Sequence, residues 1–332
     1  MLKQLLLRLG LVSLARPMLG GAGAIFVFHR IRAADPAVAF STNYRNNVPA
    51  DAFERLLDTL AEDGIEIVGL EEALFRQQAA GAGRFVCLTF DDGYRDNHDT
   101  LLPIIEARHI PITVYITPGL IDGSAPLWWY ALEQVIEREK VLHLPIPNET
   151  ALDARDHAAK RRTYDVTAGF MLTARPEASA RMMQVLADRY GVDAAALAAL
   201  HMMDWEMVRR LAASPLVEIG AHTLSHPVLA TLDETAASHE MAASRDRLER
   251  ETGRAVRHFA YPYGRRDTIG VRDIRLAAAL GFRTAVTTKP GNLMRRHAAA
   301  RYQLPRHGIG PADGPAAVRL KLAGVRNPLR QG

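Results

Sequence analysis

The chain alternates between two hydrophobic patterns. Short apolar, β-prone runs recur along it, and amphipathic stretches with a period near 3.6 residues fall between them. The runs predict seven strands, at Ile25–Phe28, Ile65–Val68, Phe85–Phe90, Thr113–Thr117, Val217–Ile219, Val256–Tyr261 and Thr284–Thr287. The amphipathic stretches predict helices at Asp51–Glu62, Asp96–Arg108, Met203–Ala213, Asp233–Thr252 and Val271–Leu280. Repeated strand–helix units indicate a parallel sheet, and their number suits an α/β barrel.

Residues 124–202 interrupt this alternation. One helix is expected to begin at Trp128, and two more at Asp153–Gly169 and Pro176–Tyr190. We therefore expect a helical insertion that forms a cap beside the strand ends. The expected organisation is an N-terminal amphipathic segment (1–24), a barrel built from 25–123 and 203–315, the insertion (124–202) and a C-terminal tail (316–332).

Two adjacent carboxylates end the predicted strand at Phe85–Phe90. The segment reads Thr89-Phe90-Asp91-Asp92-Gly93-Tyr94, in which Gly93 breaks the strand. Burying charged groups is costly unless a cation or hydrogen bonds compensate. The pair therefore indicates a metal ligand beside a general base, with an Asx-type turn that caps the next helix as the alternative.

Two histidines follow the predicted strand at Val217–Ile219, in the run Gly220-Ala221-His222-Thr223-Leu224-Ser225-His226-Pro227. Histidines four apart lie on one face of a helical turn and can chelate one ion. Together with one aspartate they give three protein ligands and leave a position for water, as in catalytic zinc sites. A histidine pair taken alone is more often structural or solvated. Zinc is the expected ion, with cobalt, nickel or manganese as alternatives.

A tight turn follows the predicted strand at Val256–Tyr261, in the run Phe259-Ala260-Tyr261-Pro262-Tyr263-Gly264. A proline between two tyrosines, closed by glycine, fixes a turn whose backbone N–H groups can point into a pocket. Such an N–H could stabilise an oxyanion. Turns of this kind occur in many β-rich loops, so the run carries weight only together with the other two motifs.

Taken in order, the three motifs resemble those of the polysaccharide deacetylases, the NodB-homology domain of carbohydrate esterase family 4. The segment Phe26-Val27-Phe28-His29-Arg30 is similar to the family's opening strand, and the resemblance extends over residues 25–120 and 203–310. It implies a distorted (β/α)7 TIM-like barrel with a helical insertion, in agreement with the hydrophobic pattern. It also implies the site residues: Asp91 as general base, Asp92, His222 and His226 as metal ligands, the Tyr263 backbone N–H as oxyanion donor, and Pro262 at the substrate.

The sequence departs from the family pattern at two places. In many members the third motif begins with an arginine that orients the base, but the matching residue here is Ala260, so another cation, or none, must set the pKa of Asp91. The last motif places a histidine shortly after a leucine as general acid. Here Leu304-Pro305-Arg306-His307 is one residue longer. We expect His307 to be the acid, with an exposed loop histidine as the alternative, and Arg306 to be structural or substrate-facing.

Two further side chains are candidates for substrate contact. His29 ends the first predicted strand and could line the pocket, or else lie at the edge of the core. Trp128 and Trp129 begin the insertion, and aromatic faces are good platforms for sugar rings. We assign Trp129 to the substrate, and we expect at least one of the two to pack inside the insertion.

Composition fits a globular enzyme. The 332 residues are 48% hydrophobic and 23% charged, which is enough to bury a substantial core. The formal net charge is only +4, and no Lys/Arg block is interleaved with aromatics, so nucleic-acid binding is not expected. The single cysteine, Cys87, lies inside a predicted strand and is expected to be a buried apolar residue, which is consistent with the cytoplasm.

The N-terminal residues resemble a signal peptide at first glance, but Arg8 interrupts the apolar run and no clean Ala-x-Ala site follows. The segment is also too short and too charged to span a bilayer. As a helix it would carry its apolar residues on one side, namely Leu2, Leu5, Leu6, Leu9 and Val12. Residues 1–16 are therefore expected to make peripheral membrane contact, to pack against the barrel or to mediate dimerisation.

The sequence thus predicts a metal-dependent deacetylase that removes the N-acetyl group of an amino sugar. The expected substrate is a polysaccharide or a lipid-linked glycan precursor, in bacterial cell-surface polysaccharide biosynthesis. The expected location is the cytoplasm, including the inner face of the membrane. The alternatives are a deformylase or other amide or ester deacylase on the same metal site, and a glycan-binding module without catalytic activity.

Overall fold

A curled parallel sheet forms the centre of the protein. The computed structural model describes residues 21–78, 84–149 and 151–324. The strand order is β11-β10-β9-β6-β5-β1-β12, with β4 paired to β5. These strands are β1 (Gly23–Phe28), β4 (Glu66–Ile67), β5 (Phe85–Phe90), β6 (Ile112–Ile116), β9 (Val217–Ala221), β10 (His258–Ala260), β11 (Thr284–Val286) and β12 (His307–Gly308). The expected α/β barrel is confirmed.

The segment 304–308 closes the sheet into a barrel. Leu304 forms a parallel bridge with Val286 of β11, and His307 pairs with Phe26 of β1. Side chains alternate between the two faces of an extended segment, so Leu304 and Arg306 face one side and His307 the other. Leu304 belongs to the apolar cluster inside the barrel, and Arg306 therefore also points inward. The sequence pattern did not predict β12.

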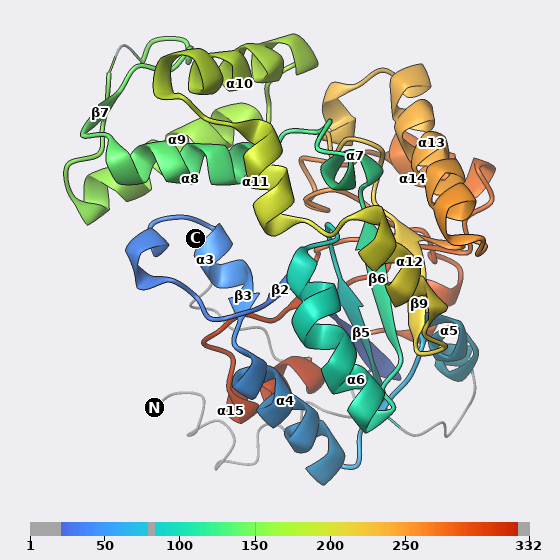
Figure 1. The fold of residues 1–332 in the computed structure, drawn as a ribbon. Coiled ribbons are helices and arrows are strands. Elements are labelled where there is room, and N and C mark those ends of the chain that lie inside the picture. The colour runs from blue at the N-terminus through green and yellow to red at the C-terminus, as the bar shows by residue number, and fades with distance from the viewer. Residues whose placement is uncertain (1–20, 79–83, 150, 325–332) are drawn as a thin grey trace.

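Helices cover the outer face of this sheet (Figure 1). Most of them follow the expected strand–helix order, with Asp204 and Asp233 as side-chain N-caps and Gly253 in the left-handed conformation after the longest helix. The helices of the barrel are α4 (Ala50–Glu62), α5 (Leu70–Gln78), α6 (Leu102–Arg108) after a π-helical turn (Asn97–Leu101), α7 (Pro118–Ile121), α12 (Trp205–Ala213), α13 (Glu234–Thr252), α14 (Val271–Ala279) and α15 (Pro315–Leu322). Residues expected as a C-terminal tail thus include α15, whose Arg319 pairs with Asp63 at the end of α4.

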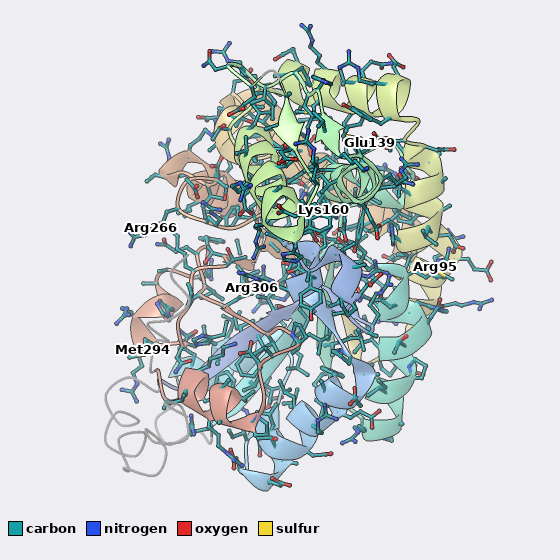
Figure 2. The ribbon with its side chains drawn as sticks, turned by 90° about the vertical axis from the view of Figure 1, so that its left-hand side faces the viewer. Arg95, Glu139, Lys160, Arg266, Met294 and Arg306 are labelled. Atoms are coloured by element: carbon teal, nitrogen blue, oxygen red, sulfur yellow. The ribbon has the colours of Figure 1, made fainter. Side chains whose placement is uncertain are left out.

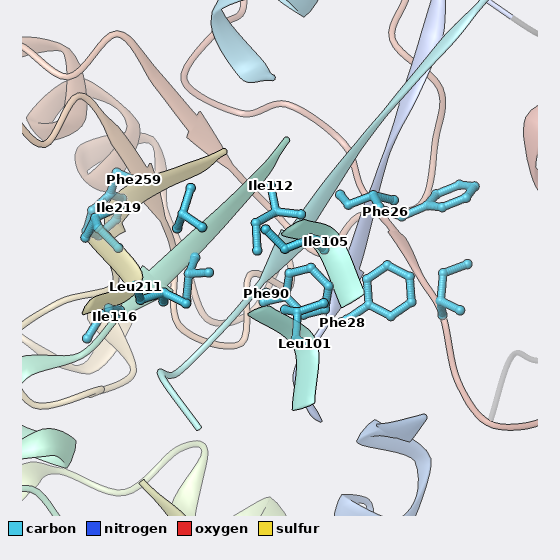
Figure 3. Packing of buried hydrophobic residues seen from close by; sticks show 14 of the residues in the cluster. Phe26, Phe28, Phe90, Leu101, Ile105, Ile112, Ile116, Leu211, Ile219 and Phe259 are labelled. Carbon is cyan, nitrogen blue, oxygen red and sulfur yellow. The ribbon is translucent and has the colours of Figure 1, made fainter. Parts of the chain in front are cut away.

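Two apolar clusters lie on the two faces of the sheet. On the outer face, Phe28 and Phe90 stack with ring centroids 5.1 Å apart, and α6 covers them (Figure 3). On the inner face, Cys87 and Tyr115 help to fill the barrel, and the prediction of a buried Cys87 is confirmed. Strands buried on both faces need long apolar runs, which explains why the sequence pattern located them.

The insertion forms a separate layer of helices at one end of the barrel (Figure 1). It contains α8 (Trp128–Arg138), α9 (His157–Met171), α10 (Pro176–Tyr190) and α11 (Ala194–His201), with the strand pair β7 (Val141–Leu142) and β8 (Leu152–Asp153). The helix expected from Asp153 begins later, because Asp153 ends β8 and the Asp156 side chain caps α9. Between β1 and α4 the chain forms three further short elements, β2 (Arg30–Ile31), α3 (Asn43–Asn46) and β3 (Asn47–Val48). The strands β2 and β3 pair with each other.

The N-terminal residues 1–16, for which membrane contact is expected, lie outside the described residues. Within the part of the chain that the structure describes, no helix is long and apolar enough to cross a bilayer.

We predict that Gly220→Ala destabilises the barrel by about 1–3 kcal/mol, the usual cost of overpacking. A Cβ at Gly220 would lie 2.3 Å from the Tyr115 ring, whereas a Cβ at Gly69 would meet no atom within 4 Å. Urea unfolding of the two variants measures the difference, with Gly69→Ala as the matched control. Equal unfolding free energies for both variants would contradict this packing of the barrel interior.

Candidate active site

Three potential metal ligands meet at the C-terminal ends of β5 and β9. Asp92 follows β5, His222 follows β9, and their ligand atoms and that of His226 lie within 4.8 Å of one another. Nε2 of His222 and Nε2 of His226 are 3.4 and 3.3 Å from Asp92 Oδ1. Bonds of ~2.0–2.1 Å to one tetrahedral ion place ligand atoms ~3.3 Å apart. The donor set and its spacing therefore fit a divalent ion such as zinc.

The two histidines are held by an irregular loop. The expected helical turn is wrong, because Thr223 and His226 have positive φ angles of 62° and 60°. The Glu240 carboxylate of α13 fixes the loop by accepting hydrogen bonds from Ser225 N and Ser225 Oγ. This Glu240 contact was missed, since nothing in the local sequence links it to the histidine motif.

Hydrogen bonds and charge prepare the three ligands for a cation. His222 Nδ1 lies 2.7 Å from the Ala260 carbonyl oxygen, so a proton on Nδ1 leaves Nε2 free to bind a metal. Burial would raise the pKa of Asp92, but His222 and His226 outweigh it and hold that pKa well below its ordinary value. Burial lowers the pKa of His226, whereas Asp92 raises that of His222 against the effect of burial.

Asp91 is bound by a buried arginine instead of pointing to the histidines. Arg306 donates from both terminal nitrogens to the two Asp91 oxygens, at 2.7 and 2.6 Å, and the Arg306 side chain is fully buried. Thr89 Oγ1 and the Thr287 carbonyl oxygen accept further hydrogen bonds from the same guanidinium. Arg306 is labelled near the middle of the molecule in Figure 2. Burial alone would raise the pKa of Asp91, but Arg306 reverses the effect and lowers it.

Arg306 thus supplies the cation that the Ala260 position lacks. Its expected contact with substrate is wrong, because its side chain is fully buried and its donors are used by Asp91, Thr89 and Thr287. The extra residue in Leu304-Pro305-Arg306-His307 was the sequence feature that could have indicated this role of Arg306. It could not be interpreted without knowing that this segment closes the barrel.

The structure does not support His307 as the general acid. Its side chain faces the outer side of the sheet, where its ring contacts Phe26 and its Nε2 lies 2.8 Å from Asn292 Oδ1. Burial lowers the pKa of His307 to about 4, so at neutral pH the ring is the neutral imidazole and not the imidazolium that a general acid requires. The alternation of side chains along the segment explains why Arg306 and not His307 enters the barrel.

The tyrosine–proline turn lies against the metal ligands. The Tyr263 ring is 4.8 Å from the His226 ring between centroids, and Pro262 is buried beside it. Tyr263 has a positive φ of 60°, and Thr288 Oγ1 donates to its carbonyl oxygen at 2.6 Å. These contacts hold the turn beside Asp92, His222 and His226, here called the metal-ligand triad, and the role of its backbone N–H stays a prediction.

Two tryptophans of the insertion complete the wall of the site. Trp129 packs edge-on against His226, with centroids 5.2 Å apart, and donates to the Tyr94 hydroxyl. Only 6% of Trp129 is exposed, so the sugar platform expected there is not supported. Trp128 instead donates to the Tyr263 hydroxyl at 3.0 Å and is half-buried.

Residues after β1 connect the barrel to the insertion. Arg30 donates to Asp96 of the barrel and to the Tyr130 hydroxyl of α8, an anchor that the sequence analysis missed although Arg30 is next to His29. His29 is half-buried, and its charge helps to lower the pKa of both Asp91 and Asp92. Asn97 Nδ2 donates to the His29 carbonyl oxygen at 3.0 Å, and a contact between the His29 side chain and substrate stays a prediction.

Several solved structures share the fold. Streptococcus pyogenes deacetylase PplD in complex with acetate has 19% identity and a TM-score of 0.56, covering 90% of this chain and 97% of its own. IcaB from Ammonifex degensii has 17% identity and a TM-score of 0.57, covering 92% and 98%. A de-N-acetylase from Aggregatibacter actinomycetemcomitans has 16% identity and a TM-score of 0.55, covering 90% and 99%. No curated protein matches the sequence.

The family model of polysaccharide deacetylases matches residues 78–143 and 162–285, which is more than half of the chain. The matched residues include Asp91, Asp92, His222 and His226, whereas Arg306 lies beyond them. The chain therefore belongs to the polysaccharide deacetylase family and is an enzyme of that class.

Proposed function

We propose that this enzyme hydrolyses the N-acetyl group of an amino sugar in a polysaccharide or lipid-linked glycan precursor and releases acetate. The observation that carries the proposal is that two adjacent aspartates after β5 have different contacts. Asp92 faces two histidines, whereas Asp91, the preceding residue, is held apart by Arg306. A ligand set beside a separate carboxylate is what metal-assisted amide hydrolysis requires.

The side chains have distinct tasks in this reaction. Asp92, His222 and His226 would hold a divalent ion, zinc by default, which when bound supplies a Lewis acid that polarises a carbonyl and acidifies water. Asp91 takes the proton of the attacking water, because Arg306 keeps it ionised and oriented, and then gives this proton to the leaving amine as the C–N bond breaks. The Tyr263 backbone N–H stabilises the developing oxyanion, and His29 contacts the substrate on the side of the two carboxylates.

Release of acetate from an N-acetyl group agrees with the printed names of two similar structures. PplD is described in complex with acetate, and the Aggregatibacter protein is described as a de-N-acetylase. We extend this to an N-acetylated glycan here. Work on a lipid-linked precursor at the inner membrane face remains part of the proposal, and it rests on the amphipathic pattern of residues 1–16.

We predict that zinc-loaded enzyme releases acetate from N-acetylated glycans or lipid-linked amino sugars, and that Asp91→Asn lowers the rate by about 10²–10⁴-fold, the usual contribution of a general base. A panel of such substrates assayed for acetate measures this. Chelation should abolish release in the wild type, and added zinc should restore it.

The matched control for this experiment is Asp99→Asn, a partly exposed carboxylate that pairs with His98. Asp91→Asn should still bind zinc, since Asp91 is not among the ligands. Full activity in Asp91→Asn, or acetate release that persists in chelator, would contradict the proposed function.

We predict that Arg306→Gln moves the acidic limb of the kcat/KM profile to higher pH. Arg306 lowers the pKa of Asp91, and without it the effect of burial would raise that pKa, so the base would become active only at higher pH. Breaking a buried ion pair also costs about 3–5 kcal/mol of stability, which urea unfolding measures. Arg301→Gln, at an exposed arginine just before the closing segment, is the control. An unshifted profile in a folded Arg306→Gln enzyme would show that Arg306 does not set the base.

A further inference from the structure

A second cluster of potential metal ligands lies at the opposite mouth of the barrel. It consists of Glu71 in the first turn of α5, Glu218 in β9 and His258 at the start of β10, whose ligand atoms lie within 4.8 Å of one another. Glu218 and His258 stand near the beginnings of their strands, whereas His222 follows the end of β9. Since the strands are parallel, this cluster is at the N-terminal mouth, and the metal-ligand triad of Asp92, His222 and His226 is at the C-terminal mouth.

The spacing of the donor atoms in this cluster matches the spacing between Asp92, His222 and His226. His258 Nε2 is 3.1 Å from Glu218 Oε1 and 3.4 Å from Glu71 Oε1. Ligands on one tetrahedral zinc ion, with bonds of ~2.0–2.1 Å, are ~3.3 Å apart. One imidazole nitrogen and two carboxylate oxygens form a donor set that zinc accepts.

The atoms that face one another in this cluster lack hydrogen bonds within the described residues. The His258 side chain is fully buried, and neither its Nε2 nor Glu71 Oε1 has a hydrogen-bond partner in that part of the chain. The distances from His258 Nε2 to Glu71 Oε1 and Glu218 Oε1 are short enough for hydrogen bonds, but the N–H direction does not point at either oxygen. Buried polar atoms without partners are costly, so a ligand that satisfies them is favoured.

The surroundings of His258 orient its Nε2 toward the carboxylates. His258 Nδ1 lies 2.6 Å from Thr284 Oγ1, which is the kind of outer contact that metal-binding histidines make. With the proton on Nδ1, the Nε2 lone pair meets two carboxylates, and this arrangement is repulsive without a cation. Arg283 binds the other Glu71 oxygen, Oε2, at 3.0 Å and leaves Oε1 to the cluster.

The cluster is accessible to ions and separate from the triad. The side chains of Glu71 and Glu218 are 36% and 26% exposed, and a cavity of about 390 Å³ lined by Glu218, Arg254 and Arg257 opens beside it. Tyr115 and Cys87 belong to the apolar cluster that fills the barrel interior. An ion bound here is therefore not part of the hydrolytic site.

We propose that Glu71, Glu218 and His258 bind a second divalent ion of the zinc or cobalt class. The ion ties α5 to β9 and β10 at the N-terminal mouth of the barrel. Its role is to hold the fold, because the catalytic groups lie at the other mouth.

The metal content of the full chain tests this proposal. Protein stripped with chelator, reloaded with Zn²⁺ and dialysed is expected to hold two ions per chain by elemental mass spectrometry. Glu218→Gln, His258→Gln and Asp92→Asn should each retain one ion, and Glu218→Gln combined with Asp92→Asn should retain none. Glu72→Gln, the exposed neighbouring carboxylate on α5, is the control and should keep both.

Co²⁺ provides a second readout that does not depend on activity. The Asp92→Asn protein loaded with Co²⁺ should show visible d–d absorption that disappears when Glu218→Gln is added. Zinc should also raise the unfolding temperature of Asp92→Asn and leave that of the double variant unchanged. If His258→Gln fails to fold, the partly exposed Glu218 position still decides the question. A single wild-type ion that is lost in Asp92→Asn, or an Asp92→Asn protein without Co²⁺ bands, would overturn the proposal in favour of a protonated His258 between two carboxylates.

Discussion

The ion pair between Arg306 and Asp91 is the interaction on which the active site depends. Two adjacent carboxylates in one buried loop repel each other, and both would be drawn to the same cation. Arg306 resolves this conflict by taking both oxygens of Asp91 from inside the barrel, while Asp92 turns to His222 and His226. This arrangement supports the proposed roles, in which Asp91 is the general base and Asp92 a metal ligand.

The same ion pair joins parts of the chain that are far apart in sequence. Arg306 belongs to the segment that closes the barrel between β11 and β1, so the segment that closes the fold also orients Asp91. The parallel topology gathers the other groups, since β5 and β9 end at the same mouth. The insertion then covers this mouth, where Trp129 packs against His226 and Trp128 donates a hydrogen bond to the Tyr263 hydroxyl.

The sequence predicted what depends on local pattern. Buried strands, capped helices and the motifs at Asp91 and His222 are visible as runs of residues, and the barrel class follows from their order. The role of Arg306, the orientation of His307 and the support from Glu240 depend on pairing between distant segments. Strand β12 has only two residues, and without its register the inward side chain could not be distinguished from the outward one. The loop at His226 also escaped prediction, because two non-glycine residues there adopt left-handed φ angles.

The different environments of the two carboxylates are therefore the central claim, and anomalous diffraction at the zinc edge from crystals of the zinc-loaded full chain tests it most directly. The account predicts an ion bound by Asp92, His222 and His226, with Asp91 still paired to Arg306 and outside the coordination sphere. An ion coordinated by Asp91, or an Asp91 released from Arg306 when the ion binds, would contradict it.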